Sequence, residues 1–305
     1  MDLDARILVT GQCGWVGSAV VRRLWAAGYS NIRFLAPGEA DLTRAAPVQA
    51  MLFRERPEYV WLTAPREGAG GARPGEAVRE SLAVQANVIH AAWRAEVRKL
   101  CFLASSGVYP ARALPPLQDG SLLSTAVGPG QDASVLAQIA GIRMCQVYRR
   151  QYRFDAVSAV PAELYGPGDS AGAQAGVLPA LVRRLYEAQA AGAAELAISA
   201  VPAREWLQVD DFADAALFLM QRYSSELPVN VGGEAMAFAD LARLAAETVG
   251  YRGRLLFGGR TAAPGQAMRD GAWLNTMGWS PYMPLRDGVE QMCAWYLQGV
   301  GPVMA

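Results

Sequence analysis

The stretch "RILVTGQCGWVGSAVVRRLWAAG", residues 6–28, decides the fold because a β-rich run passes through a glycine loop directly into a helical pattern. Gly11 permits the tight turn, Gly14 lets the backbone approach a pyrophosphate, and Gly17 allows close packing of helix and strand. The helix N-terminus adds N–H groups and the positive end of its dipole. The stretch therefore predicts a Rossmann-type nucleotide-binding unit.

Strand-like and helical runs alternate along the following chain. The β-rich runs are "IRFLA", "YVWLTA", "KLCFLAS", "DAVSAVP" and "ELAIS". Such alternation predicts an α/β fold with a doubly wound parallel sheet and a smaller C-terminal substrate lobe at its carboxyl edge. We expect residues 1–165, rejoined by about 206–232, to form the nucleotide-binding domain, and 166–205 with 233–305 to form the smaller lobe.

Composition bears on the classes of partner. Hydrophobic residues make up 52% of the 305, and Lys plus Arg equals Asp plus Glu at 28 each, which argues against nucleic acid or a membrane surface as partner. Neither a signal-peptide pattern nor an apolar run of about 20 residues is found, and the four cysteines are widely spaced, so we expect a reduced, cytoplasmic protein without a metal. His90, the only histidine, has no neighbouring Cys or His and is expected to be buried and structural.

The segment after the second β-rich run bears on the cofactor. "RFLAPGEADL" offers no basic residue between Arg33 and Arg44 that could hold a 2′-phosphate. Asp41 and Leu42, in "ADLT", are candidate neighbours of an adenine ring. The fold is compatible with NAD(P), but these residues give a phosphorylated cofactor little to bind.

A family resemblance rests on several stretches together: "NVIHAA", "KLCFLASSGVYP", "QIAGIRMCQVYRRQY", "AELYGPGD", "GVLPALVRRLYEA", "REWLQVDDFADA" and "VNVGG". From residue 6 to about residue 300 the chain resembles GDP-L-fucose synthases, which are extended short-chain dehydrogenase/reductases. The resemblance implies NADPH-dependent epimerisation and reduction of GDP-4-keto-6-deoxymannose. It also implies a homodimer built from helices that flank the active site.

The reductase positions of that family can be compared one at a time. The family uses a serine after a strand, and a tyrosine and a lysine four residues apart on the next helix. Ser105 keeps the serine position, but Ser134 stands at the tyrosine position and Gln138 at the lysine position. A serine hydroxyl is too short and too weak an acid, and an amide carries no charge, so neither can replace the lost group.

The epimerase positions are also changed. The family has a cysteine and a histidine where this chain has Gly107 and Gly176, and glycine has no side-chain proton to transfer. Arginines that the family tends to carry near the cofactor are replaced by Cys13, Ala36 and Gly38. Each charge-assisted hydrogen bond lost there is worth roughly 1.5–3 kcal/mol.

The nucleotide-sugar positions are mixed. Arg184 and Arg204 match family positions near the nucleotide diphosphate. Ala197 replaces a tryptophan, and Glu163 replaces an asparagine. Glu163 is expected to oppose an anionic ligand by bringing like charges together.

These changes favour a pseudoenzyme that is kept for binding, assembly or regulation. The expected partner is a second copy or an active paralogue, joined through the helices around residues 132–152 and 78–95, with a nucleotide sugar as candidate ligand. In a second hypothesis the cleft performs new chemistry, with Glu163 and Asp132 as acid/base groups beside Ser105, Ser106 or Tyr109. Asp132 can equally cap the helix that follows it.

A third hypothesis keeps the NADP-dependent reductase and epimerase activity of the family. It requires the lost tyrosine and lysine to be supplied from elsewhere, and the sequence holds no second Y-x-x-x-K. Tyr148 lies on the same helix as Ser134 but roughly 20 Å further along it, at ~1.5 Å per residue. Tyr148 therefore cannot serve the same substrate atom.

Overall fold

The computed structural model describes residues 1–11, 14–35, 39–63, 73–108, 134–169, 176–199, 204–258 and 272–300. Its centre is a six-stranded parallel sheet in the order β2-β1-β3-β4-β5-β9. These strands span Ile7–Val9 (β1), Ile32–Phe34 (β2), Tyr59–Thr63 (β3), Lys99–Leu103 (β4), Asp155–Pro161 (β5) and Val229–Val231 (β9). The predicted α/β fold with a parallel sheet is confirmed.

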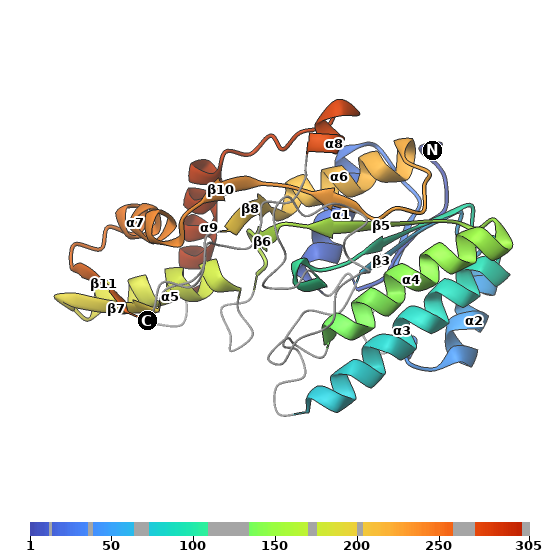
Figure 1. Ribbon diagram of the computed structural model, residues 1–305, viewed down its shortest axis with the longest axis horizontal. Helices are drawn as coiled ribbons and strands as arrows, with labels where there is room; N and C mark the ends of the chain where they lie inside the picture. Colours follow the sequence, from blue (N-terminus) through green and yellow to red (C-terminus); the bar gives the residue numbers. More distant parts are fainter. Residues whose placement is uncertain are drawn as a thin grey trace.

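Helices cover both faces of this sheet (Figure 1). One layer contains α1 (Trp15–Ala26) and α6 (Val209–Arg222), and the other contains α2 (Ala45–Glu55), α3 (Pro74–Arg94) and α4 (Ser134–Tyr152). Successive strand residues point to opposite faces, so Ile7 and Val9 join the first core while Leu8 joins the second. Because the strands are buried on both faces, they read as continuous apolar runs.

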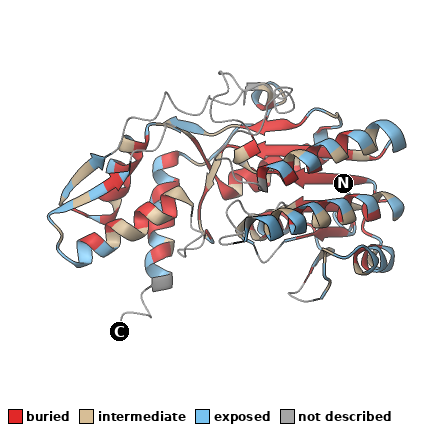
Figure 2. Ribbon diagram, turned by 60° about the horizontal axis from the view of Figure 1, so that its bottom comes forward, coloured by how far each residue is buried: buried red, intermediate tan, exposed pale blue. Residues whose placement is uncertain are grey.

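The smaller lobe has its own hydrophobic core between α5, α7 and α9 (Figure 2). Its elements are β6 (Glu163–Tyr165), α5 (Val177–Ala190), β7 (Glu195–Ser199), β8 (Arg204–Gln208), β10 (Glu234–Met236), α7 (Phe238–Val249), β11 (Arg254–Gly258) and α9 (Leu285–Val300). A 3-10 turn (Ser106–Val108) follows β4, and a short helix, α8 (Ala272–Thr276), precedes α9.

One strand predicted from the sequence lies outside the central sheet, within the range expected for the smaller lobe. "ELAIS" forms β7, which in the described part of the chain pairs in parallel with β11. A second small sheet, β10-β8-β6, connects the two lobes, because β8 leads directly into α6 of the large lobe. These pairings join segments far apart in the chain, which an apolar run alone does not reveal.

Buried carboxylates and amides attach the C-terminal segment to the large lobe. Asp211, in the first turn of α6, accepts hydrogen bonds from the N–H groups of Tyr282 (3.1 Å) and Met283 (3.2 Å). Gln208 caps α6 through its carbonyl and donates from Nε2 to Gln291 of α9 (3.1 Å). Both contacts fix α9 relative to the carboxyl edge of the sheet.

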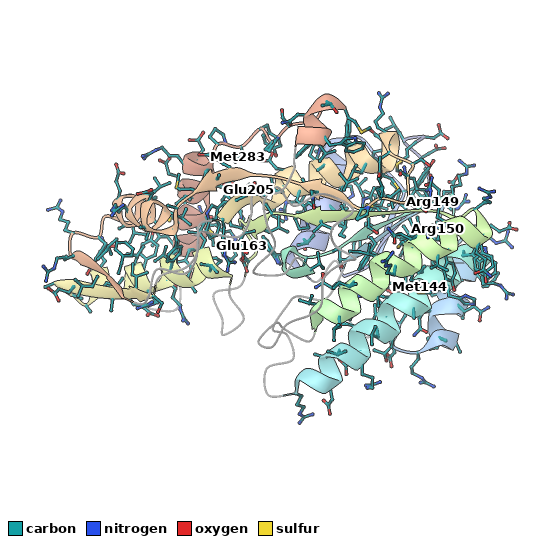
Figure 3. All side chains as sticks on the ribbon, viewed as in Figure 1. Met144, Arg149, Arg150, Glu163, Glu205 and Met283 are labelled. Atoms are coloured by element: carbon teal, nitrogen blue, oxygen red, sulfur yellow. The ribbon has the colours of Figure 1, made fainter. Side chains whose placement is uncertain are left out.

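Helix α4 is anchored at its C-terminal end by basic residues (Figure 3). Arg149 pairs with Asp155 at the start of β5, and Arg150 forms a two-pronged ion pair with Glu226. Gln146, which is buried, donates to the Glu226 carbonyl (3.0 Å) and accepts from Arg143 (3.2 Å). Cations suit this position because the C-terminus of a helix is the negative end of its dipole.

Lys99 is the only lysine in the sequence, and it is buried at the start of β4. Its ammonium donates to the carbonyls of Leu219 (2.9 Å) and Met220 (2.7 Å), and also to that of Tyr223. These carbonyls lie at the C-terminal end of α6, where a helix runs short of N–H donors, and the Leu219 carbonyl also accepts from the Tyr223 N–H (3.0 Å). Burial lowers the pKa of Lys99, but the carbonyl bonds give the cation a structural role.

No helix in the described part of the chain has both the length and the apolar character needed to cross a bilayer.

Replacing Lys99 by Met should lower the free energy of unfolding by about 2–3 kcal/mol, because buried carbonyls would lose a charged donor. The neighbouring Arg98 provides a control, since its side chain is 61% exposed in the ion pair with Glu58 (3.0 Å). Arg98→Met should change stability by less than about 1 kcal/mol. Urea unfolding followed by fluorescence measures both, and equal effects would contradict the structural role of Lys99.

Candidate functional site

The glycine loop begins where β1 ends, and Gly11 is required there by both conformation and space. Its φ of +71° lies in the left-handed region, and the hydroxyl of Thr63 fills the volume that a side chain would need. Thr63 Oγ1 donates to the Thr10 carbonyl (2.9 Å), which joins the ends of β1 and β3. The loop is therefore held tightly against the edge of the sheet.

Helix α1 begins directly after the glycine loop. Its N-cap is Gly14, and no described side chain caps it, nor is there an acidic residue in its first turn. The Gly14 N–H donates to the Gly11 carbonyl (2.8 Å), and Gly17 is buried within the helix. N–H groups at the positive end of a helix dipole suit a pyrophosphate, so this part of the chain fits a dinucleotide.

Asp41 and Leu42 form a turn in front of α2. Asp41 Oδ1 accepts from the hydroxyl (2.6 Å) and the N–H (3.0 Å) of Thr43, and the hydroxyl bond lowers the pKa of Asp41. The Leu42 carbonyl accepts from Asn87 of α3 (3.0 Å). Their contact with an adenine stays a prediction.

The basic residues next to β2 are already paired. Arg33 forms ion pairs with Glu39 and, at 3.6 Å, with Glu55, and Arg54 also pairs with Glu55 (2.7 Å). The positions Cys13, Ala36 and Gly38 lie outside the described residues. These ion pairs leave Arg33 and Arg54 poorly suited to holding a 2′-phosphate.

Ser105 and Gln138 are brought together at the carboxyl end of β4. Gln138 is only 1% exposed, and its Oε1 accepts a 2.6 Å hydrogen bond from the Ser105 N–H. Ser105 Oγ accepts from the Gly107 N–H (3.2 Å), and Ser134 begins α4 one turn before Gln138. The position expected to match the family's lysine therefore holds a neutral side chain with a structural bond.

The single lysine cannot compensate for this change. Lys99 lies at the opposite end of β4 from Ser105, six residues and therefore about 20 Å away at ~3.3 Å per residue. Its ammonium is held there by the carbonyls that end α6. No other residue of the sequence can supply an ammonium side chain.

Glu163 and Arg204 form an ion pair between the neighbouring strands β6 and β8. Arg204 Nη1 lies 2.5 Å from Glu163 Oε2, and the two side chains are 23% and 17% exposed. Figure 3 shows Glu163 at the junction of the two lobes. Glu163 was expected to oppose an anionic ligand, but its charge is matched by Arg204 in this ion pair.

The other nucleotide-sugar positions lie around α5. Gly176 is the N-cap of α5, and Arg184 on that helix donates to the carbonyl of Ala197 in β7. The bond joins α5 to the small two-stranded sheet, so Arg184 has a structural contact. Tyr109 and Asp132 lie outside the described residues.

His90 is exposed, so its expected burial is wrong. Its Nδ1 lies 2.8 Å from Tyr148 Oη, and it borders a cluster of rings shared by α3 and α4. In this cluster Trp93 stacks on Tyr152 with centroids 4.1 Å apart. The apolar spacing around His90 belongs to the other side of α3, which faces the core.

Among the described residues, neither a reactive thiol nor a set of metal ligands is found. Cys101, Cys145 and Cys293 are unpaired and buried, and burial raises the pKa of Cys101 and of Cys145 to about 12. Such thiols are poor nucleophiles. Within the described part of the chain, no three His, Cys, Asp or Glu side chains gather closely enough to hold a metal ion.

The parallel sheet, the glycine loop at the start of α1 and the lobe beyond the carboxyl edge define an extended Rossmann-type nucleotide-binding protein. The chain belongs to the NAD dependent epimerase/dehydratase family, whose sequence model matches residues 7–232. It is 41% identical to GDP-L-fucose synthase 1 of Arabidopsis thaliana, over 98% of this chain and 95% of that protein. It is 33% identical to GDP-L-fucose synthase of Escherichia coli, over 96% and 97% of the two chains.

Solved structures support the same assignment. A GDP-D-glycero-L-gluco-heptose synthase from Campylobacter jejuni, crystallised in the presence of NADPH, has a TM-score of 0.88 at 27% identity, covering 97% of this chain and 99% of that one. A GDP-mannoheptose C4 reductase from the same organism, with NADP bound, has a TM-score of 0.86 at 29% identity, covering 97% and 99%. The relatives named here are therefore described as enzymes that act on GDP-sugars.

Replacing Gln138 by Lys should destabilise the protein by about 1–3 kcal/mol, because lysine has no acceptor for the Ser105 N–H and would bury a charge. Gln138→Glu keeps an acceptor at that place and should be milder when its carboxyl is protonated. Thermal and urea unfolding measure both. A lysine variant as stable as the parent would show that the Ser105 bond contributes little.

Proposed function

We propose that this chain is a non-catalytic relative of GDP-L-fucose synthases that acts through binding and assembly. The observation that carries the proposal is Gln138, which is buried at the family's lysine position and bonded through its carbonyl to Ser105. A relay that needs a nearby cation to lower the pKa of a tyrosine has neither group here.

The loss of epimerisation rests on two further positions. Gly107 lies in the turn after β4, and Gly176 caps α5. Neither can take or give a proton at a substrate carbon. Reduction and epimerisation thus lack their proton-transfer groups on different structural elements. The residues that form the glycine loop and the cores of both lobes are kept.

The ion pair at the lobe junction supports weak binding of a GDP-sugar. Arg204, at a family position near the diphosphate, is bonded to Glu163. To bind Arg204, an anionic ligand must either break the ion pair with Glu163 or interact with a pair that has no net charge. Partial burial makes that separation unfavourable, because both charges would lose a close partner.

The outer surface of α3 and α4 supports assembly as the remaining role. Leu82 on α3 and Leu136, Val147 and Tyr152 on α4 are exposed. Figure 1 shows the two helices side by side at the edge of the molecule. Exposed apolar and aromatic groups mark interaction surfaces, and the partner we propose is a second copy or an active paralogue.

A turnover assay with NADPH and GDP-4-keto-6-deoxymannose tests the proposal, with the Ser134→Tyr/Gln138→Lys double variant beside the parent. The parent should oxidise no NADPH above the protein-free rate. The double variant should stay inactive as an epimerase, because Gly107 and Gly176 are unchanged. The E. coli relative serves as positive control, and turnover by the parent would overturn the proposal.

Glu163→Asn should strengthen GDP binding by about threefold, because Arg204 would lose its internal partner in a site that is only partly screened from water. Glu195→Gln is the matched control, since it breaks the Glu195–Arg254 pair on exposed strands of the same lobe. Calorimetric titration with GDP measures both variants. Unchanged affinity in Glu163→Asn would show that the pair does not govern this subsite.

A further inference from the structure

The turn that follows β6, residues 166–169, lies directly against the first residue of α1. Gly168 has a φ of +92°, in the left-handed region that favours glycine, and an added Cβ there would lie 3.3 Å from Trp15 Cβ. The Asp169 N–H donates to the Gly166 carbonyl (3.2 Å), and Asp169 is fully buried. The turn therefore has a fixed shape, and its backbone packs on the start of the helix after the glycine loop.

The same stretch of chain contacts one helix from each lobe. An added Cβ at Gly166 would lie 2.9 Å from Val209 Cγ1, at the start of α6. Just before the turn, Tyr165 ends β6, and an added Cβ at Gly288 of α9 would lie 2.9 Å from the Tyr165 ring. Figure 1 shows β6 between α9 and α1. Because such close packing leaves little free volume, a shift of α1 against the turn is transmitted to α6 and α9.

The two candidate nucleotide positions lie at the two ends of this series of contacts. At one end Trp15 follows Gly14, where the N–H groups at the start of α1 fit the pyrophosphate of a dinucleotide. At the other end, β6 begins with Glu163, which pairs with Arg204 at the position expected to lie near the diphosphate of a GDP-sugar. The turn therefore connects the two positions through one short, closely packed stretch of backbone.

We propose that the turn at residues 166–169 couples the two positions, so that a dinucleotide at the glycine loop strengthens the binding of GDP at Arg204. A dinucleotide orders the start of α1 and, through Trp15, the turn and β6. GDP then binds to a strand that has already lost its conformational entropy, which gives positive cooperativity without a large structural change. Because such coupling is reciprocal, GDP strengthens dinucleotide binding by the same factor. The inference rests on the proposed role in binding, and no bond is formed or broken.

Calorimetric titration of the full-length protein with GDP, in the absence and presence of saturating NAD⁺ or NADP⁺, tests the coupling. We expect the dinucleotide to tighten GDP binding about fivefold, at the lower end of typical allosteric coupling. The reverse titration should give the same factor. An unchanged or weaker GDP affinity, or no heat from the parent with either kind of ligand, would overturn the inference. Turnover of a GDP-sugar by the parent would instead overturn only the proposed non-catalytic function.

Gly168→Ala tests whether the turn carries the coupling, and Gly278→Ala is the matched control. The two glycines have nearly equal φ, +92° and +91°, so alanine meets the same backbone strain at both. Beyond its chain neighbours, however, no described residue comes within 4 Å of an added Cβ at Gly278. Gly168→Ala should reduce the coupling factor to about one, whereas Gly278→Ala should keep it. Val209→Ala, which removes a contact of the turn without straining the backbone, should reduce the factor as well. A factor like that of the parent in both Gly168→Ala and Val209→Ala would overturn the role of the turn.

Discussion

The hydrogen bond from the Ser105 N–H to Gln138 Oε1 determines what the site can do. It joins the carboxyl end of β4 to the first half of α4. The glycine loop and the second lobe lie at this same carboxyl edge of the parallel sheet. A lysine could not make this bond, because it has no acceptor. Position 138 therefore holds a fixed, neutral amide, which sets both the charge and the packing at the carboxyl end of β4.

Charge is removed from the cleft by pairing as well as by substitution. Arg204 pairs with Glu163, and Arg33 pairs with Glu39 and Glu55. The only lysine of the sequence, Lys99, lies at the opposite edge of the sheet, where it binds carbonyls at the end of α6. The described groups at this edge of the sheet are neutral: the N–H groups at the start of α1 and the Gln138 amide bonded to Ser105. This combination favours holding a nucleotide over reacting with it.

The sequence was sufficient for the fold because the glycine spacing and the apolar strands are local signals. Gly11 illustrates this, since its position after β1 predicts a residue with a positive φ. The partner of Glu163 could not be read in the same way, because Arg204 is 41 residues away and meets it only through the pairing of β6 with β8. Likewise, the apolar spacing around His90 did not reveal which side of α3 the ring occupies.

The central claim is that the chain holds no working hydride relay. Incubation of a large molar excess of protein with deuterated NADPH and GDP-4-keto-6-deoxymannose tests it most directly, because even one turnover labels the sugar. Mass spectrometry of the recovered GDP-sugar should find no more deuterium than a protein-free sample contains. Deuterium on the sugar carbon that was the ketone, at an amount that increases with protein concentration, would contradict the account.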